Sequence, residues 1–352
     1  MNVLTGRNIN ETLLKGIDFF QDPTNFRVQE SRNGVTFEAL EPVTTVYERP
    51  WERVCLIKER DANPFFHFIE GLWMIAGRED LEPLTFFVKS MEDFSDDGKT
   101  LHGAYGYRWR ANFNFNQLTM IVNILRNNPD DRRCVLQMWS PVDDLGKPTK
   151  DAPCNTNIYF KVRDNELDMT VCCRSNDMLW GAYGANVVHM SMLQEYMAYK
   201  IGVHPGRYRQ ISDSFHVYPN EVWKRVKHLK IDPMTFREHW VNPYDKLKDY
   251  KYRSFAAEPD SIRPCPHLDD ELHIFFDSML GTTYEWKSYA IRKIAKPMVM
   301  AYKAYKDNDI ENSYRHVQEI EPVDWMLACF NWIKKRDKSG KVTLINKPKE
   351  TI

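Results

Sequence analysis

The order of the hydrophobic patterns constrains this chain most: strand-like segments gather in its middle, and helical segments lie before and after them. Residues 155–175 form two β-rich runs on either side of residues 163–165, which predicts a hairpin. Residues 132–140 and 206–219 predict two more strands. Helical, highly charged segments follow. This order indicates an α+β fold with a helical addition on the C-terminal side.

Three apolar runs predict helices around the strands. The first begins at Pro64, a residue suited to the first turn of a helix. Residues 118–128 predict a second helix, and residues 186–201 predict a third that ends at Gly202. Glu70 lies inside the first run, where an unpaired buried carboxylate is costly. We therefore expect Glu70 to reach solvent, to be paired, or to line a cavity.

The composition excludes several classes of protein. The 352 residues carry a formal net charge of −1, so no basic field favours binding of nucleic acid, and no direct nucleic-acid partner is expected. No apolar run approaches the ~18 residues of a membrane helix, and the N-terminal residues are too polar for a signal peptide. The seven cysteines include no CxxC pair and form no disulfide framework, which favours a reducing cytoplasm. Metal-ligand spacing is absent as well, so we expect no metal.

Cys154 is the most informative single residue, because it lies between a proline and three polar residues at the entrance of a predicted strand. A structural cysteine usually has apolar neighbours, whereas an exposed thiolate is stabilised by nearby cations. Arg132, Arg133 and Arg174 lie at the ends of adjacent predicted strands and are candidates for those cations. Cys154 is thus either a nucleophile or an inert small residue.

Two further polar clusters lie at strand ends. Arg174 and Ser175 have the donors that bind a phosphate dianion, although a strand-end turn has the same composition. His216 and Tyr218 lie on one face of a predicted strand, where they can bind a sugar hydroxyl or form a core pair.

Taken in chain order, these segments resemble the thymidylate synthase family. The resemblance covers about residues 25–220, with a weaker echo at 263–268. The matching segments are residues 32–34, 70–73, 105–110, 132–133, 153–154, 174–177, 186 and 216–218.

The resemblance implies a three-layer α+β fold whose twisted mixed sheets pack back to back in a homodimer with shared active sites. Residues 1–268 would form the catalytic domain, and residues 269–352 a helical extension packed on it. Such enzymes occur in phages that modify their DNA and in nucleoside-antibiotic pathways, so the host cytoplasm is the expected location for a phage-encoded member.

The resemblance also assigns residues to a nucleotide. Arg32, Arg174 and Ser175 would hold the 5′-phosphate, joined by Arg132 and Arg133 of the partner subunit.

His216 and Tyr218 would bind the 3′-hydroxyl, and Asp177 would anchor the pterin of the co-substrate 5,10-methylenetetrahydrofolate. Asn186 would read the base.

The implied chemistry begins with Cys154. Its thiolate attacks C6 of the pyrimidine and thereby makes C5 nucleophilic toward the one-carbon unit. The surrounding arginines are expected to lower the pKa of the thiol. Glu70 would manage protons at the base through ordered water, and Tyr105 would help to remove the C5 proton.

Three departures from ordinary thymidylate synthases favour a hydroxymethylase. Residues 78–97 contain no tryptophan where the family has shielding indole rings, and Met91 and Phe94 stand nearest those places. Residues 155–157 read Asn-Thr-Asn instead of beginning with His or Ala. Residues 347–352 are not the hydrophobic tail that closes over the site in thymidylate synthases. A less shielded intermediate favours capture by water over hydride transfer.

The base is expected to be uracil. An Asn amide at position 186 donates to O4 and accepts from N3–H of uracil, whereas an Asp would suit cytosine. The segment 181–186 is one residue longer than is usual in the family, so cytosine stays open. Hydroxymethylation of dUMP, or of dCMP, is the preferred function.

Three alternatives remain. The first is thymidylate synthase proper, which methylates dUMP reductively. The second is a non-catalytic homologue that binds nucleotides or RNA. In the third, Trp325 and Trp332, seven residues apart, form a partner-binding face, although a packed core stripe is the preferred interpretation.

Overall fold

The computed structural model describes residues 1–229, 241–247, 250–258, 261–279, 281 and 283–338. Its centre is one eight-stranded sheet in which six strands have the order β1-β4-β8-β7-β6-β5, and the β2–β3 hairpin joins β8 through β3. The β1–β4 and β7–β8 pairs are parallel and the other pairs are antiparallel. The strands are β1 (Asn2–Gly6), β2 (Phe26–Ser31), β3 (Gly34–Ala39), β4 (Val43–Tyr47), β5 (Val135–Gln137), β6 (Asn155–Arg163), β7 (Glu166–Asp177) and β8 (His204–Val217).

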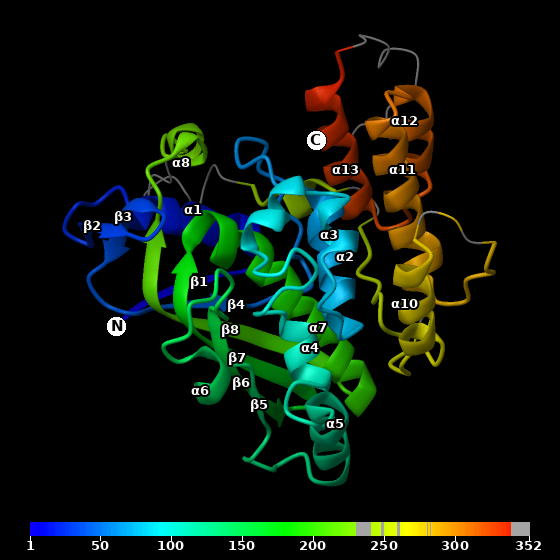
Figure 1. The fold of residues 1–352 in the computed structure, drawn as a ribbon, viewed down its shortest axis with the longest axis horizontal. Coiled ribbons are helices and arrows are strands. Elements are labelled where there is room, and N and C mark those ends of the chain that lie inside the picture. The colour runs from blue at the N-terminus through cyan, green and yellow to red at the C-terminus, as the bar shows by residue number, and fades with distance from the viewer. Residues whose placement is uncertain (230–240, 248–249, 259–260, 280, 282, 339–352) are drawn as a thin grey trace.

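Helices flank this sheet in two further layers (Figure 1). Helices α1 and α7 lie against the sheet, and α2 packs on α7, with α10, α11 and α13 beside α2. The helices are α1 (Ile9–Phe19), α2 (Pro64–Ile75), α3 (Glu82–Thr85), η1 (Lys89–Phe94), α4 (Tyr105–Arg110), α5 (Gln117–Asn127), α6 (Pro141–Asp144), η2 (Met178–Ala185), α7 (Asn186–Ile201), α8 (Glu221–Val226), η3 (Pro243–Lys246), α10 (Leu268–Asp277), η4 (Ile291–Ala295), α11 (Lys296–Lys306), α12 (Ile310–Gln318) and α13 (Val323–Arg336). In the described residues, no helix combines the length and the apolar character that spanning a bilayer requires.

The α+β prediction is confirmed, and so are its central elements. The β6–β7 hairpin turns at Asp164 and Asn165, which both have positive φ as a tight hairpin turn requires. Pro64 lies at the first turn of α2, and α7 ends at Gly202 with φ of 99°.

The expectation that only helices precede the central strands is wrong. Strands β1 to β4 lie before α2 in the chain and belong to the same sheet. The hairpin strand β2 is almost entirely exposed, so no burial alternates along it, and β1 has only five residues. Neither strand produces a periodic hydrophobic signal.

The sheet has a buried face and an outward face. Along β6, Ile158, Phe160 and Val162 point into the core beneath the helices, whereas Tyr159 between them is half exposed. Val135 of β5, opposite Tyr159, is exposed as well. The outward face therefore carries apolar side chains that the described helices do not cover.

Trp325 and Trp332 belong to the core, which agrees with the interpretation that the sequence favours over a partner-binding face. Both indoles are buried, and Trp325 packs edge-on against Phe68 of α2 with ring centroids 5.1 Å apart. Trp332 packs in the same way against Phe65, at 5.6 Å. Helix α13 is thus packed on α2 through aromatic contacts.

We expect Trp325→Ala to lower the free energy of unfolding by about 3–5 kcal/mol, because it leaves a cavity between α13 and α2. Urea unfolding followed by circular dichroism measures this loss. Trp180→Ala is the matched control, because Trp180 is 52% exposed, and it should cost less than about 1 kcal/mol. Equal losses in the two variants would show that α13 contributes no packing energy.

Candidate active site

Cys154 immediately precedes β6, and the hydroxyl of Tyr105 fixes its backbone. The Tyr105 oxygen accepts hydrogen bonds from the N–H groups of Cys154, at 3.1 Å, and of Asn155, at 3.0 Å. Burial and the neighbouring thiol raise the pKa of Tyr105 well above 10, so the phenol keeps its proton. The structure thus gives Tyr105 a positioning contact beside the candidate nucleophile.

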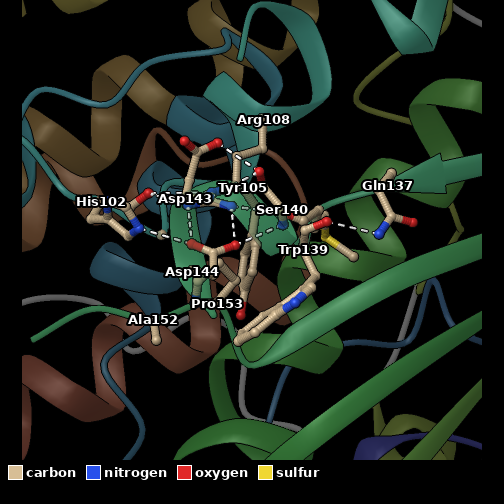
Figure 2. A network of polar contacts seen from close by, with 12 residues as sticks. His102, Tyr105, Arg108, Gln137, Trp139, Ser140, Asp143, Asp144, Ala152 and Pro153 are labelled. Carbon is tan, nitrogen blue, oxygen red and sulfur yellow. Dashed lines mark hydrogen bonds and ion pairs between the residues drawn. The ribbon is translucent and has the colours of Figure 1, made fainter. Parts of the chain in front are cut away.

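Helix α4, which begins with Tyr105, is itself anchored by a buried ion pair (Figure 2). The Arg108 guanidinium donates to both Asp144 oxygens, at 2.7 and 2.8 Å, and to the Met138 carbonyl at 2.7 Å. Asp144 also contacts His102 Nε2 at 2.8 Å and accepts from the Ser140 N–H at 2.7 Å. Because each of these polar groups has a hydrogen-bond partner, the network fixes α4 and thereby holds Tyr105 next to Cys154.

Two of the predicted arginines contact the segment that precedes Cys154. Arg174 on β7 donates to the carbonyls of Pro153, at 2.9 Å, and Ala152, at 3.0 Å. Arg32, at the β2–β3 turn, donates to the carbonyl of Lys150 at 3.1 Å. Both guanidinium groups are therefore placed beside the segment that carries the thiol.

The expected lowering of the thiol pKa is wrong for this protomer. Burial raises the pKa of Cys154, Asp151 adds to the increase, and Arg174 and Arg32 only partly oppose it. The thiol therefore carries a proton near neutral pH.

The structure does not bring Arg132 and Arg133 to Cys154 of the same chain. They precede β5, which pairs with β6 so that Val135 lies opposite Tyr159, toward the end of β6 remote from Cys154. Arg133 instead pairs with Asp131 at 2.6 Å. The interpretation of these arginines as local cations in the same chain is wrong, whereas their supply by a partner subunit stays a prediction.

Ser175, Asp177, His216 and Tyr218 lie at one end of the β7–β8 pair. Asp177 is opposite His216, and Ser175 is opposite Ser214. The His216 Nδ1–H donates to the Ser214 carbonyl at 3.1 Å, which leaves Nε2 as an acceptor. The His216 and Tyr218 rings meet edge to face at 5.4 Å. The two rings form the pair that the sequence pattern predicts.

One oxygen of Asp177 caps η2 by accepting the N–H groups of Leu179, at 2.7 Å, and Trp180, at 2.6 Å. Its other oxygen is buried and has no hydrogen-bond partner among the described residues. Burial raises the pKa of this carboxyl. A ligand with N–H donors would satisfy the free oxygen.

Glu70 is buried on α2 and lies opposite α7. Its Oε2 is 2.9 Å from Nε2 of His189, which is an ion-pair distance although the angle is unfavourable for a hydrogen bond. Of the three expectations for Glu70, burial rules out that its carboxylate reaches solvent, and His189 is the residue placed to pair with it when the imidazole is protonated. The sequence pattern did not single out His189, which stands on a helix of mostly apolar residues.

Asn186 is the first residue of α7, and its amide is engaged on both sides. Its Oδ1 accepts from Asn155 Nδ2 at 3.4 Å, and its Nδ2 donates to Asn176 Oδ1 at 3.1 Å. The preceding segment η2 is kinked, because Tyr183 and Gly184 have non-helical φ/ψ angles.

Sequence reasoning missed the contributions of Asp151, Asn155 and Asn176. Asp151 Oδ2 accepts the Gly103 N–H at 2.8 Å, and burial raises its pKa. The available signal was polarity: Asn155 directly follows Cys154, Asn176 directly precedes Asp177, and Asp151 lies three residues before Cys154. In the described part of the chain, no group of three or more His, Cys, Asp or Glu side chains is arranged to hold a metal.

Arg174→Gln should raise the pKa of Cys154 further, because the variant removes the cation that opposes the increase most strongly. The rate of iodoacetamide labelling of the Cys154 peptide as a function of pH, measured by mass spectrometry, reports this pKa. Arg163→Gln at the remote end of β6 is the control and should leave the profile unchanged. If the labelling rate of Arg174→Gln depended on pH in the same way as that of the wild-type enzyme, the electrostatic role of this arginine would be contradicted.

Comparison with known proteins agrees with this geometry. The sequence model of the thymidylate synthase family matches residues 25–265. The chain is 42% identical over 344 residues to a deoxyuridylate hydroxymethyltransferase of Pseudomonas phage M6, which covers 96% of this chain and 95% of the relative. It is 37% identical over 204 residues to the enzyme of the same name from Bacillus phage SP01, covering 55% of this chain and 53% of that one.

The fold has a solved counterpart. The crystal structure of thymidylate synthase from T4 phage matches with a TM-score of 0.50 at 20% sequence identity, over 61% of this chain and 80% of that one. With motifs, fold and full-length similarity in agreement, the chain belongs to the thymidylate synthase family, in its hydroxymethylase branch.

Proposed function

We propose that this enzyme transfers the one-carbon unit of 5,10-methylenetetrahydrofolate to C5 of dUMP and releases 5-hydroxymethyl-dUMP. The observation that carries the proposal is the similarity to a deoxyuridylate hydroxymethyltransferase over nearly the whole of both chains. The geometry supports it, because Cys154 lies beside two cations and its backbone is fixed by Tyr105.

In this proposal the phosphate dianion binds Arg32, Arg174 and Ser175, and His216 Nε2 with the Tyr218 hydroxyl binds the 3′-hydroxyl. Cys154 Sγ then forms a bond to C6, and the electron pair of the C5–C6 double bond moves onto C5 and toward O4. Because the buried thiol starts protonated, its proton must leave before or during the attack.

Proton management falls to Glu70 and Tyr105. Glu70 is buried, with its Oε2 2.9 Å from His189 Nε2, so we propose that it acts on O4 through ordered water rather than by direct contact. Tyr105, whose oxygen already accepts two N–H groups, has its own O–H free to donate to such a water. C5 would form a bond to the one-carbon unit; transfer of the C5 proton to the ordered water, with cleavage of the carbon–nitrogen bond and departure of tetrahydrofolate, would leave a methylene on C5 of the base.

We propose that water adds to that methylene and forms the hydroxymethyl group, after which Cys154 Sγ leaves C6 and the C5–C6 double bond is restored. The segment 78–97 has no indole, and Phe94 at one of the corresponding places is 45% exposed. Solvent therefore has access where the family carries shielding rings. The terminal residues 347–352, which the sequence also suggests do not close the site, lie outside the described residues.

The co-substrate fits the residues present at Asp177. When bound, methylenetetrahydrofolate supplies the one-carbon unit at the oxidation level of formaldehyde. The buried, unpartnered oxygen of Asp177 is an acceptor for pterin N–H groups, whose binding would remove the cost of leaving it unsatisfied.

We further propose a homodimer formed by the outward face of the sheet, in which Arg132 and Arg133 reach the partner's phosphate site. The exposed Val135 and Tyr159 support this face as the interface. We also propose that residues 1–268 form the catalytic unit and that 269–352 are an extension of it. The phage origin of the relatives supports action in the cytoplasm of a host cell.

Incubation with methylenetetrahydrofolate and either dUMP or dCMP, followed by mass analysis of the nucleotide, tests the reaction. We expect 5-hydroxymethyl-dUMP, no increase in dihydrofolate absorbance, and no product from Cys154→Ser. Formation of dTMP with dihydrofolate would instead identify a thymidylate synthase, and product from Cys154→Ser would exclude the covalent adduct.

Mixing inactive variants tests the shared site. Reassorted dimers of Cys154→Ser with the Arg132→Ala/Arg133→Ala double variant should regain about a quarter of the wild-type activity, because half of the dimers then contain one complete site. Cys154→Ser mixed with Arg174→Ala is the control and should stay inactive, since both residues serve a site in the same chain. Recovery in neither mixture would contradict arginine donation across the interface.

A further inference from the structure

Six side chains form a continuous line of hydrogen bonds that runs beneath the site, which we call the amide chain. Each member donates to the next in one direction. The bonds are Tyr208 Oη to Gln210 Oε1 (2.8 Å), Gln210 Nε2 to Asn155 Oδ1 (3.3 Å), Asn155 Nδ2 to Asn186 Oδ1 (3.4 Å), Asn186 Nδ2 to Asn176 Oδ1 (3.1 Å) and Asn176 Nδ2 to Ser212 Oγ (2.9 Å).

Asn186 is the only member of the amide chain that is not buried. It lies one hydrogen bond from Asn155, which directly follows Cys154. Each primary amide has two N–H groups and two lone pairs, and the amide chain uses one of each at Asn186. One N–H and one lone pair of Asn186 therefore remain for a ligand.

The backbone is shaped to permit this arrangement. The register in which β6 pairs with β7 shifts between Asn155 and Asn157, which forms a β-bulge. This bulge directs the Asn155 side chain into the interior. At Gly181 a Cβ atom would lie 2.4 Å from Asn176 Oδ1 and 3.1 Å from Asn186 Nδ2. A side chain at position 181 would thus displace the amides from one another.

The amide chain couples the orientations of its members. If one amide turned by 180°, its oxygen would face an oxygen and its NH₂ group an NH₂ group, so all three asparagines and Gln210 must turn together. The two ends favour the observed direction. A phenol is a better donor and a poorer acceptor than an alcohol, so Tyr208 suits the donating end and Ser212 the accepting end.

We infer that the amide chain holds Asn186 in one orientation and thereby makes the site selective for uracil over cytosine, with Tyr208, Gln210, Asn155 and Asn176 as positioning residues. The inference rests on the proposed function and on Asn186 facing the base. Uracil presents O4 as an acceptor beside N3–H as a donor, whereas cytosine presents an N4 amino donor beside an N3 acceptor. If the Asn186 amide turned by 180°, its donor and its acceptor would exchange places, and it would match cytosine instead of uracil.

Two isosteric variants test the inference: one is expected to turn the Asn186 amide over, and the other is expected to leave it in place. Asn155→Asp removes the donor to Asn186 Oδ1, so the Asn186 NH₂ group should turn toward the new carboxylate and present the pattern for cytosine. Asn176→Asp keeps the acceptor that Asn186 Nδ2 needs and preserves the orientation. Both variants add the same carboxyl group to a buried neighbour of Asn186, so each controls for the other.

The measured quantity is the ratio of kcat/KM for dUMP to that for dCMP, together with the Kd of each nucleotide from equilibrium titration. The wild-type enzyme should prefer dUMP in both kcat/KM and Kd. Asn155→Asp should lower the preference for dUMP in each of these two quantities by roughly tenfold or more. Asn176→Asp should keep each preference within about threefold of the wild-type value.

A second pair avoids buried carboxyl groups. Tyr208→Phe removes the donating end and should also weaken the preference for dUMP. Tyr47→Phe is its control, because the two rings stack at 5.0 Å but the Tyr47 hydroxyl donates to the Ala182 carbonyl, outside the amide chain.

Equal Kd values for dUMP and dCMP in the wild-type enzyme would overturn the inference. So would unchanged ratios in both Asn155→Asp and Tyr208→Phe. Failure of the wild-type enzyme to hydroxymethylate either nucleotide would refute the proposed function instead, while the titrations would still test the orientation of Asn186.

Discussion

The hydroxyl of Tyr105 is the contact on which the site depends, because it accepts two consecutive N–H groups where β6 begins. One of these belongs to Cys154, the candidate nucleophile, and the other to Asn155, a member of the amide chain. Through α4, the same hydroxyl is tied to the buried Arg108–Asp144 pair. A single oxygen thus sets the position of the group that would attack C6 and of the groups that would orient the base.

Burial and charge act against each other at Cys154. Desolvation and Asp151 raise the thiol pKa, and two nearby guanidinium groups only partly compensate. A protonated thiol is protected from oxidation and alkylation while the site is empty, since the thiolate is the reactive form. In the proposed mechanism, formation of the nucleophile is therefore coupled to events in the filled site.

Much of the site was predictable because its residues sit in short local motifs. Cys154, Arg174 and the His216–Tyr218 pair could be recognised from polar residues at strand ends, and the structure places them at or near the ends of the adjacent strands β6, β7 and β8. The position of Arg132 and Arg133 could not be inferred, because it depends on the register in which β5 pairs with β6. Of the N-terminal strands, β2 was missed because nearly all of it is exposed, and β1 because it has only five residues.

The amide chain shows a second limit of sequence reasoning. Asn155, Asn176 and Gln210 come from three different strands, and nothing in their local surroundings indicates that they meet. The sign of the thiol pKa shift was mispredicted for a similar reason. Counting nearby arginines captures the charges, but the degree of burial becomes known only from the fold.

The kink in η2 has a consequence for the helix that follows it. Tyr183 and Gly184 have non-helical φ/ψ angles, and after this kink α7 begins with Asn186 within hydrogen-bond reach of Asn155 and Asn176. A substitution that straightened η2 would move the first turn of α7 and separate Asn186 from both partners.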